Sequence, residues 1–250
     1  MTPEKIERVK GLLPTTLGSE EIRRTIAADI LRRSVFSARM ASATYLAKIR
    51  DVCSRMLAGE INQATAVLEL TRVLSAMGHS PLDGEKLTNP ASLRRLNLII
   101  DTQTQMAASA ARIGNQTEAT VALWPAWELV RFASRRNPRG DWPARWRAAG
   151  DSVGWTGAVR HRFVALKSSP VWGALGQGAG GFKDTLGNPY PPFAFNSGMD
   201  WREVTAGECK RIGLAVDGAE TPERAKLSPA RRDILEAVER YGFPEIGDGL

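Results

Sequence analysis

Residues 188–201 read Asn-Pro-Tyr-Pro-Pro-Phe-Ala-Phe-Asn-Ser-Gly-Met-Asp-Trp, and no other stretch of the chain constrains its backbone so strongly. Its three prolines fix φ, remove backbone N–H donors and favour an extended conformation for the residue before each of them. The aromatic side chains in this stretch are apolar enough to require burial. We therefore predict a rigid structural loop, attached to a core through Phe193 and Phe195, with these residues at its centre: Tyr190, Pro191, Pro192, Phe193, Phe195 and Asn196.

The composition is that of an ordinary soluble protein with an excess of positive charge. The chain has 250 residues and a formal net charge of +7, so it can form one large domain or two small ones. The charge favours acidic partners such as nucleic acid or an acidic protein surface, although a solvated basic surface explains it equally well. No apolar run reaches the length of a signal peptide or membrane span, so we expect production in the cytoplasm and no membrane contact.

Helical patterns dominate the first half of the chain. Apolar residues recur every three or four positions between residues 19 and 57, which predicts one amphipathic helix or a broken pair. A second helix is expected over about 62–77. A third, over 91–113, follows Asn89 and Pro90, a cap and a first-turn proline. By spacing, its Arg94 and Arg95 face away from the apolar side of the helix. Both cysteines, Cys53 and Cys209, fall in predicted helices, and a disulfide framework is not expected.

The second half of the chain mixes strand and helix patterns. Residues 123–132 and 159–167 carry bulky apolar side chains and predict strands, while 142–150, 203–212 and 229–241 predict helices. The glycine-rich segment 173–187 looks irregular and lacks the order of a phosphate-binding loop. We expect an α+β protein with a helical region over 1–87, a compact domain over 88–212 and a helical appendage over 213–250. The compact domain is expected to contain a small antiparallel sheet covered by helices.

The residues that usually carry catalysis are few and scattered. Only His79 and His161 could act as an imidazole base, and neither they nor the cysteines show the spacing of a nucleophilic or zinc site. Several aspartates fall in the second half, but their spacing matches no metal-dependent hydrolase motif: Asp141, Asp151, Asp184 and Asp200. We predict no catalytic residue, no metal and no cofactor.

Arginine and aromatic residues alternate in the segment around residues 127–147. Guanidinium groups suit phosphate oxygens and also stack on indole rings, so two interpretations stay open. In one, these arginines contact DNA, mostly through its phosphates: Arg131, Arg135, Arg136, Arg139, Arg145 and Arg147. In the other, they stack on the neighbouring aromatic side chains and stabilise a small domain: Trp127, Phe132, Trp142 and Trp146.

Residues 90–201 resemble the Mu F-like minor head proteins of tailed bacteriophages, also called phage head morphogenesis proteins. The resemblance follows the order of a helix with a polar stretch and then small residues, a tryptophan-containing strand followed by arginines, Pro170-Val171-Trp172, and the loop over 190–196. Many members carry a His-Gly turn and end the loop with Cys-Arg-Cys. Here those stretches read Trp146-Arg147-Ala148-Ala149-Gly150 and Asn196-Ser197-Gly198-Met199, which removes potential metal ligands.

The resemblance implies a structural protein at the portal vertex, present in multiple copies on an oligomeric portal, that acts in head assembly or DNA delivery. It would occur in the virion and, during assembly, in the host cytoplasm. Portal or other head proteins are its expected partners, docked by the N-terminal helices, with double-stranded DNA as a further partner. Two alternatives stay open: a DNA-binding or metal-dependent nuclease-like enzyme, and a basic interaction module unrelated to phages.

Overall fold

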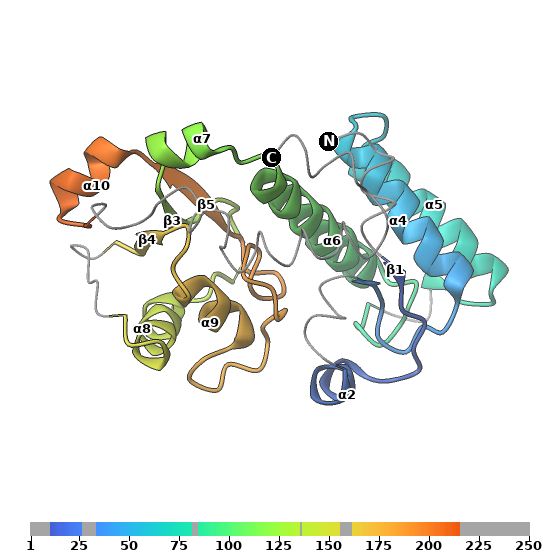
Figure 1. Cartoon of the computed structure of the whole chain (residues 1–250). Coiled ribbons are helices and arrows are strands. Elements are labelled where there is room, and N and C mark those ends of the chain that lie inside the picture. Colours follow the sequence, from blue (N-terminus) through green and yellow to red (C-terminus); the bar gives the residue numbers. More distant parts are fainter. Residues whose placement is uncertain (1–10, 27–33, 82–84, 136, 156–161, 216–250) are drawn as a thin grey trace. The chain divides into compact units, whose positions relative to one another are not determined.

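The computed structural model describes residues 11–26, 34–81, 85–135, 137–155 and 162–215, and it has the expected α+β fold (Figure 1). The chain divides into two compact units, Met1–Ala108 and Ser109–Leu250. The division lies inside helix α6, Leu93–Gly114, whereas we expected a boundary before that helix, at residue 87. The helix expected over 229–241 lies outside the described residues.

The first unit is mainly helical. Its helices are α2 (Ser19–Thr25), α4 (Ala43–Leu57), α5 (Gln63–Ala76) and the first part of α6. A short parallel pair joins β1 (Gly11–Leu12) to β2 (Ser34–Val35), where we expected helix. The amphipathic pattern over 19–57 therefore contains two helices, α2 and α4, and not one continuous helix. Helix α4 starts at its own cap, since the Ser42 hydroxyl accepts a hydrogen bond from the Tyr45 N–H at 3.2 Å.

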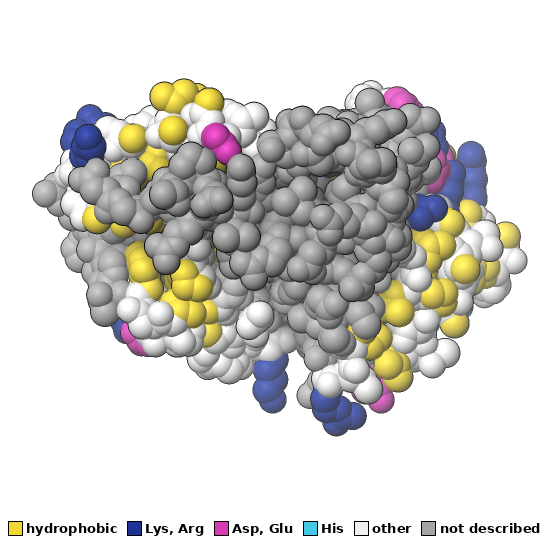
Figure 2. Space-filling model, in the orientation of Figure 1, with side chains coloured by type: hydrophobic (Ala, Val, Ile, Leu, Met, Phe, Trp, Pro, Cys, Tyr) yellow, Lys and Arg dark blue, Asp and Glu magenta, His cyan; other side chains and the backbone are white. Residues whose placement is uncertain are grey.

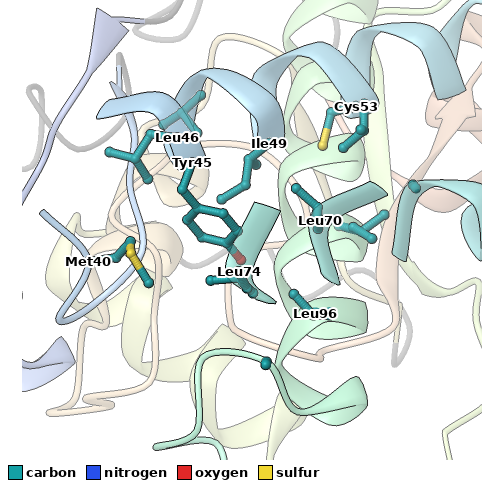
Figure 3. Close-up of a cluster of buried hydrophobic side chains, with 13 residues drawn as sticks. Met40, Tyr45, Leu46, Ile49, Cys53, Leu70, Leu74 and Leu96 are labelled. Atoms are coloured by element: carbon teal, nitrogen blue, oxygen red, sulfur yellow. The ribbon is translucent and has the colours of Figure 1, made fainter. Parts of the chain in front are cut away.

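The core of the first unit lies between α4, α5 and the start of α6. In Figure 3, Tyr45 and Ile49 of α4 face Leu70 and Leu74 of α5 and Leu96 of α6. All five are fully buried. These are the three- and four-residue spacings expected from the sequence, and they place one apolar stripe of each helix against the others.

Arg95 is buried beside this core, although its spacing predicted that it faces away from the apolar side of the helix. Its guanidinium donates to the Ser37 hydroxyl at 2.8 Å and to the Leu87 carbonyl at 3.2 Å. Burial lowers the pKa of Arg95. The side chain therefore connects α6 to two irregular segments through neutral oxygen acceptors.

The second unit is built on an antiparallel sheet in the order β4-β3-β5. Strand β3 (Ala126–Arg131) lies in the centre, between β4 (Val164–Leu166) and β5 (Met199–Val204). The helices are α7 (Glu118–Leu123), α8 (Trp142–Ser152), α9 (Val171–Gln177) and α10 (Ala206–Ile212). Helix α10 covers one face of the sheet, where Cys209 packs against Ala126, Val164 and Val204.

Three expectations for this unit were incomplete. The segment over 203–212 is the end of β5 followed by α10, and not one helix. Helix α7 was not predicted. Helix α9 occupies the start of the glycine-rich segment, and one of its two glycines, Gly176, serves packing. A Cβ at Gly176 would lie 1.8 Å from the Asn188 carbonyl oxygen, so only glycine allows α9 to approach the loop that begins there.

The other face of the sheet carries a cluster of aromatic rings. Trp127 of β3 stacks on Trp201 of β5 with ring centroids 3.6 Å apart. Trp172 of α9 meets both rings edge-on, and Trp146 of α8 meets Trp172 at 5.2 Å. Phe193, from the proline-rich loop, is fully buried and lies 6.1 Å from the Trp172 ring. The loop is therefore attached to a core, as its sequence predicts.

Within the loop, only one of the two expected phenylalanine anchors is buried. Phe195 is half-buried and Asn196 is exposed, whereas Tyr190, Pro191, Pro192 and Phe193 are all buried. Phe193 and Asn196 both have positive φ angles, 51° and 52°, and the peptide bond between Pro191 and Pro192 is cis. The chain turns at these positions, and this turn separates the environments of the two phenylalanines.

We predict that Phe193→Ala lowers the free energy of unfolding of the second unit by about 3–5 kcal/mol, because it leaves a cavity beside the tryptophans. Phe195→Ala is the matched control and should cost about 1 kcal/mol. All seven tryptophans lie between residues 124 and 201, so urea unfolding followed by tryptophan fluorescence reports on this unit alone. Equal losses in the two variants would contradict the assignment of Phe193 as the anchor.

Candidate functional site

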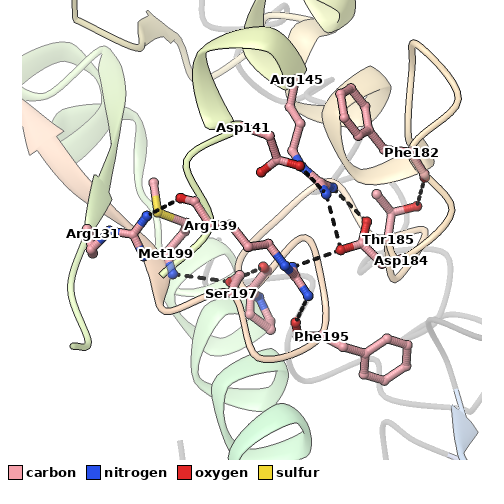
Figure 4. Close-up of polar contacts among 11 residues, drawn as sticks. Arg131, Arg139, Asp141, Arg145, Phe182, Asp184, Thr185, Phe195, Ser197 and Met199 are labelled. Atoms are coloured by element: carbon pink, nitrogen blue, oxygen red, sulfur yellow. Dashed lines mark hydrogen bonds and ion pairs between the residues drawn. The ribbon is translucent and has the colours of Figure 1, made fainter. Parts of the chain in front are cut away.

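The buried Arg145 lies at the centre of a charge cluster in the second unit, between two half-exposed carboxylates. Its guanidinium donates to Asp141 Oδ2 at 2.9 Å and to Asp184 Oδ1 at 2.8 Å, and it lies 4.3 Å from the Phe182 ring centroid (Figure 4). Only 6% of the Arg145 side chain is exposed. Burial alone would raise the pKa of Asp184, but hydrogen bonding by Arg145 and the charge of Arg139 lower it. We therefore assign Arg145 to stability, as in the aromatic-stacking interpretation, and remove it from the expected DNA contacts.

Arg139 connects this charge cluster to the proline-rich loop. One of its nitrogens, Nη1, lies 2.9 Å from Asp184 Oδ2, and Nη2 donates to the Phe195 carbonyl at 2.6 Å. Figure 4 shows the Phe195 ring pointing away from this network, so the backbone and not the ring makes the contact. Arg131, at the end of β3, in turn donates to the Arg139 carbonyl at 2.7 Å. The arginine-rich segment is thus folded back onto the loop.

The remaining predicted arginines have different surroundings. Arg135 is half-buried beside Gly198, where a Cβ on the glycine would lie 3.2 Å from Arg135 Cγ. Arg147 is exposed, and its side chain forms no ion pair within the described residues. Arg136 lies outside the described residues. Arg131 and Arg147 are the members of the predicted set that are exposed and have no carboxylate partner in the part of the chain that the structure describes.

A second charge cluster, which the sequence reading missed, lies on the α10 side of the sheet. Arg162 bonds Glu128 at 2.7 Å and Glu208 at 2.8 Å, and Arg202 bonds the same two carboxylates. Hydrogen bonding by Arg202 lowers the pKa of Glu208 to about 2. Glu128 and Arg202 are directly paired across β3 and β5, a signal visible only once the strand register is known. The cluster contains two positive and two negative side chains and is neutral.

A buried lysine lies on the aromatic side of the sheet. Lys167 Nζ is 2.8 Å from Glu203 Oε2 and 5.3 Å from the centroid of Trp127. The other oxygen of Glu203 accepts a hydrogen bond from the Trp127 indole N–H at 3.0 Å. Burial lowers the pKa of Lys167, and the hydrogen bond to Glu203 opposes that shift. This arrangement holds the lysine in an ion pair with Glu203 and against the Trp127 ring.

The four aspartates considered as metal ligands do not converge on one site. Asp141 and Asp184 meet at the Arg145 guanidinium, Asp200 pairs with Arg112 at 3.0 Å, and Asp151 is exposed. In the described ranges, no group of three His, Cys, Asp or Glu side chains is placed to hold a metal ion. Cys53 and Cys209 are both buried, and they do not form a disulfide. His161 lies outside the described residues.

No model of a known protein family, no curated protein and no solved structure matches this chain. The resemblance of residues 90–201 to the Mu F-like proteins therefore stays a prediction. None of the described helices combines the length and the apolar character needed to cross a membrane. Function has to be inferred from the contacts and charges of the described side chains.

We predict that Arg145→Met destabilises the second unit by about 1.5–3 kcal/mol, because it leaves the half-exposed Asp141 and Asp184 without their shared cation. Arg147→Met, two residues away on the same helix, is the matched control and should change stability by about 0.5 kcal/mol or less. Adding Asp141→Asn and Asp184→Asn to Arg145→Met should recover part of the loss. Urea midpoints measure all three, and an unchanged midpoint for Arg145→Met would show that the cluster contributes no stability.

Proposed function

We propose that this chain is a minor head protein of a tailed bacteriophage that acts in head morphogenesis at the portal vertex. One observation carries the proposal: the segments on which the family resemblance rests are distant in sequence but share one core. Trp172 of the Pro170-Val171-Trp172 segment and Phe193 of the proline-rich loop lie 6.1 Å apart, and both contact Trp201. Short motifs that matched the family by chance would not be expected to meet in one core. Their contact therefore supports the resemblance.

The surroundings of the charged side chains favour an assembly role over catalysis. Catalytic acids and bases need access to a substrate. Here Arg145 is enclosed by carboxylates, and Glu128 and Glu208 are each bonded by two arginines. Ion pairs of this kind fix the positions of loops and strands relative to each other. A rigid small domain held in this way suits a component that docks to an oligomeric portal in several copies.

DNA contact is a second part of the proposal. Arg131 and Arg147 are exposed and Arg135 is half-exposed, and the net charge of +7 favours an anionic partner. These side chains would contact phosphates and not bases, so binding should depend on salt and be indifferent to sequence. Passage of packaged DNA through the portal requires that kind of contact.

Association with procapsids tests the main proposal. The purified chain is mixed with procapsids of the phage that encodes it, either containing the portal or assembled without it, and the mixtures are separated by sedimentation. We expect the chain to sediment with portal-containing particles and to remain at the top of the gradient with portal-free ones. Equal behaviour in the two samples would contradict a role at the portal vertex.

For DNA, we predict that Arg131→Ala combined with Arg147→Ala weakens duplex binding and lowers the slope of log affinity against log salt by about 2. Arg72→Ala with Arg94→Ala is the control, because it removes the same charge at exposed positions of the first unit. Anisotropy of a labelled duplex across a salt series measures both slopes. Equal slopes in the two variants would show that Arg131 and Arg147 do not contact DNA. Magnesium-dependent cleavage of a plasmid would instead favour a nuclease.

A further inference from the structure

Helix α7 ends in apolar side chains that are exposed. None of its six residues is buried, yet it is well capped: the Thr117 hydroxyl accepts from the Thr120 N–H at 3.2 Å, and the Thr120 hydroxyl accepts from the Thr117 N–H at 2.8 Å. Leu123, at its end, is 60% exposed, and the next residue, Trp124, is 36% exposed. A single exposed leucine is common, but adjacent Leu and Trp side chains on an ordered element form an anchor suited to a partner.

Two exposed cations lie on α10, a helix that follows β5 at the end of the sheet where α7 precedes β3. Ala126, two residues after Trp124, is paired with Val204, and α10 begins two residues later, so α7 and α10 both leave the sheet at this end (Figure 1). Lys210 and Arg211 in the last turn of α10 are exposed and form no ion pair within the described ranges. Figure 2 shows hydrophobic side chains over α7 and Lys or Arg side chains beside α10. The two helices that join the sheet at this end thus carry an apolar projection, at α7, and positive charge, on α10.

We propose that Leu123, Trp124, Lys210 and Arg211 form a docking surface for an acidic amphipathic helix of a partner protein. The apolar stripe of such a helix would cover Leu123 and Trp124, and its flanking carboxylates would pair with Lys210 and Arg211. A protein fits better than single-stranded nucleic acid, because Leu123 is the more exposed of the two apolar residues and offers no ring for base stacking. The surface lies outside the arginine-rich segment, and the proposal does not depend on the role at the portal.

Two labelled peptides of about 20 residues, long enough to form a helix, provide the probes. One has leucines on a single helical face flanked by glutamates, and the other has lysine in place of every glutamate. We expect the full chain to bind the acidic peptide at least about tenfold more tightly than the basic one, a difference of roughly 1.4 kcal/mol. Leu123→Ser with Trp124→Ser should weaken binding of the acidic peptide by a similar factor. Lys210→Glu with Arg211→Glu should reverse the preference between the peptides.

Matched controls distinguish binding at this surface from nonspecific binding elsewhere on the chain. Leu68→Ser removes a leucine that is 49% exposed on α5, and Arg72→Glu with Arg94→Glu makes the same charge change in the first unit. Both controls should bind the acidic peptide like the unmodified chain, and circular dichroism should confirm that every variant is folded. Equal binding of the two peptides, or equal losses in the surface and control variants, overturns the proposal. So does tighter binding of a single-stranded oligonucleotide that depends on Trp124, which would identify a nucleic-acid surface.

Discussion

The contact between Gly176 and Asn188 is the constraint on which the second unit depends. The Gly187 N–H donates to the Gly176 carbonyl at 2.9 Å, and a side chain at Gly176 would collide with the Asn188 backbone. This contact holds the proline-rich loop against α9 where the loop begins. The loop then places Phe193 beside both Trp172 of α9 and Trp201 of β5, two rings that also contact each other directly. The rigid loop can hold Phe193 in the aromatic cluster only because α9 approaches the start of the loop so closely.

Many charged side chains of this protein pair with one another, and others are exposed. A net charge of +7 suggests a basic surface, but Arg139, Arg145, Arg162 and Arg202 all bond carboxylates within the second unit. Ion pairs of buried or half-buried groups position elements, even where their net contribution to stability is small. Exposed cations such as Arg131, Arg147, Lys210 and Arg211 are therefore better guides to partners than the total charge. Arginines that are close in sequence, such as Arg145 and Arg147, can have different surroundings because residues two positions apart lie on different sides of a helix.

Local signals predicted much of the fold and little of the charge clusters. Helical periodicity and the proline pattern identified α5, α6 and the buried part of the loop, because these depend on neighbours in sequence. Strand β5 was missed because its first residues were assigned to the proline-rich loop and Glu203 interrupts its alternation of apolar and polar residues. Only pairing with β3 places Trp201 on the aromatic side. Arg95 was assigned to the wrong side of its helix because its acceptors come from distant loops. The charge cluster around Glu128 was missed for a similar reason. Its members are brought together by the pairing of strands and not by their spacing in the sequence.

The edges of the sheet explain why we place a partner at its end. At the outer edge of β5, the Trp201 N–H is bonded by the Asp200 carboxylate at 2.7 Å, and the Trp201 carbonyl accepts from Arg112 at 3.4 Å. At the edge of β4, the Leu166 carbonyl accepts from the Trp172 indole at 2.9 Å. A partner strand would have to break these side-chain contacts before it could pair with either edge. Recognition through exposed side chains at the end of the sheet, where α7 and α10 emerge, requires no such rearrangement and leaves the aromatic cluster intact.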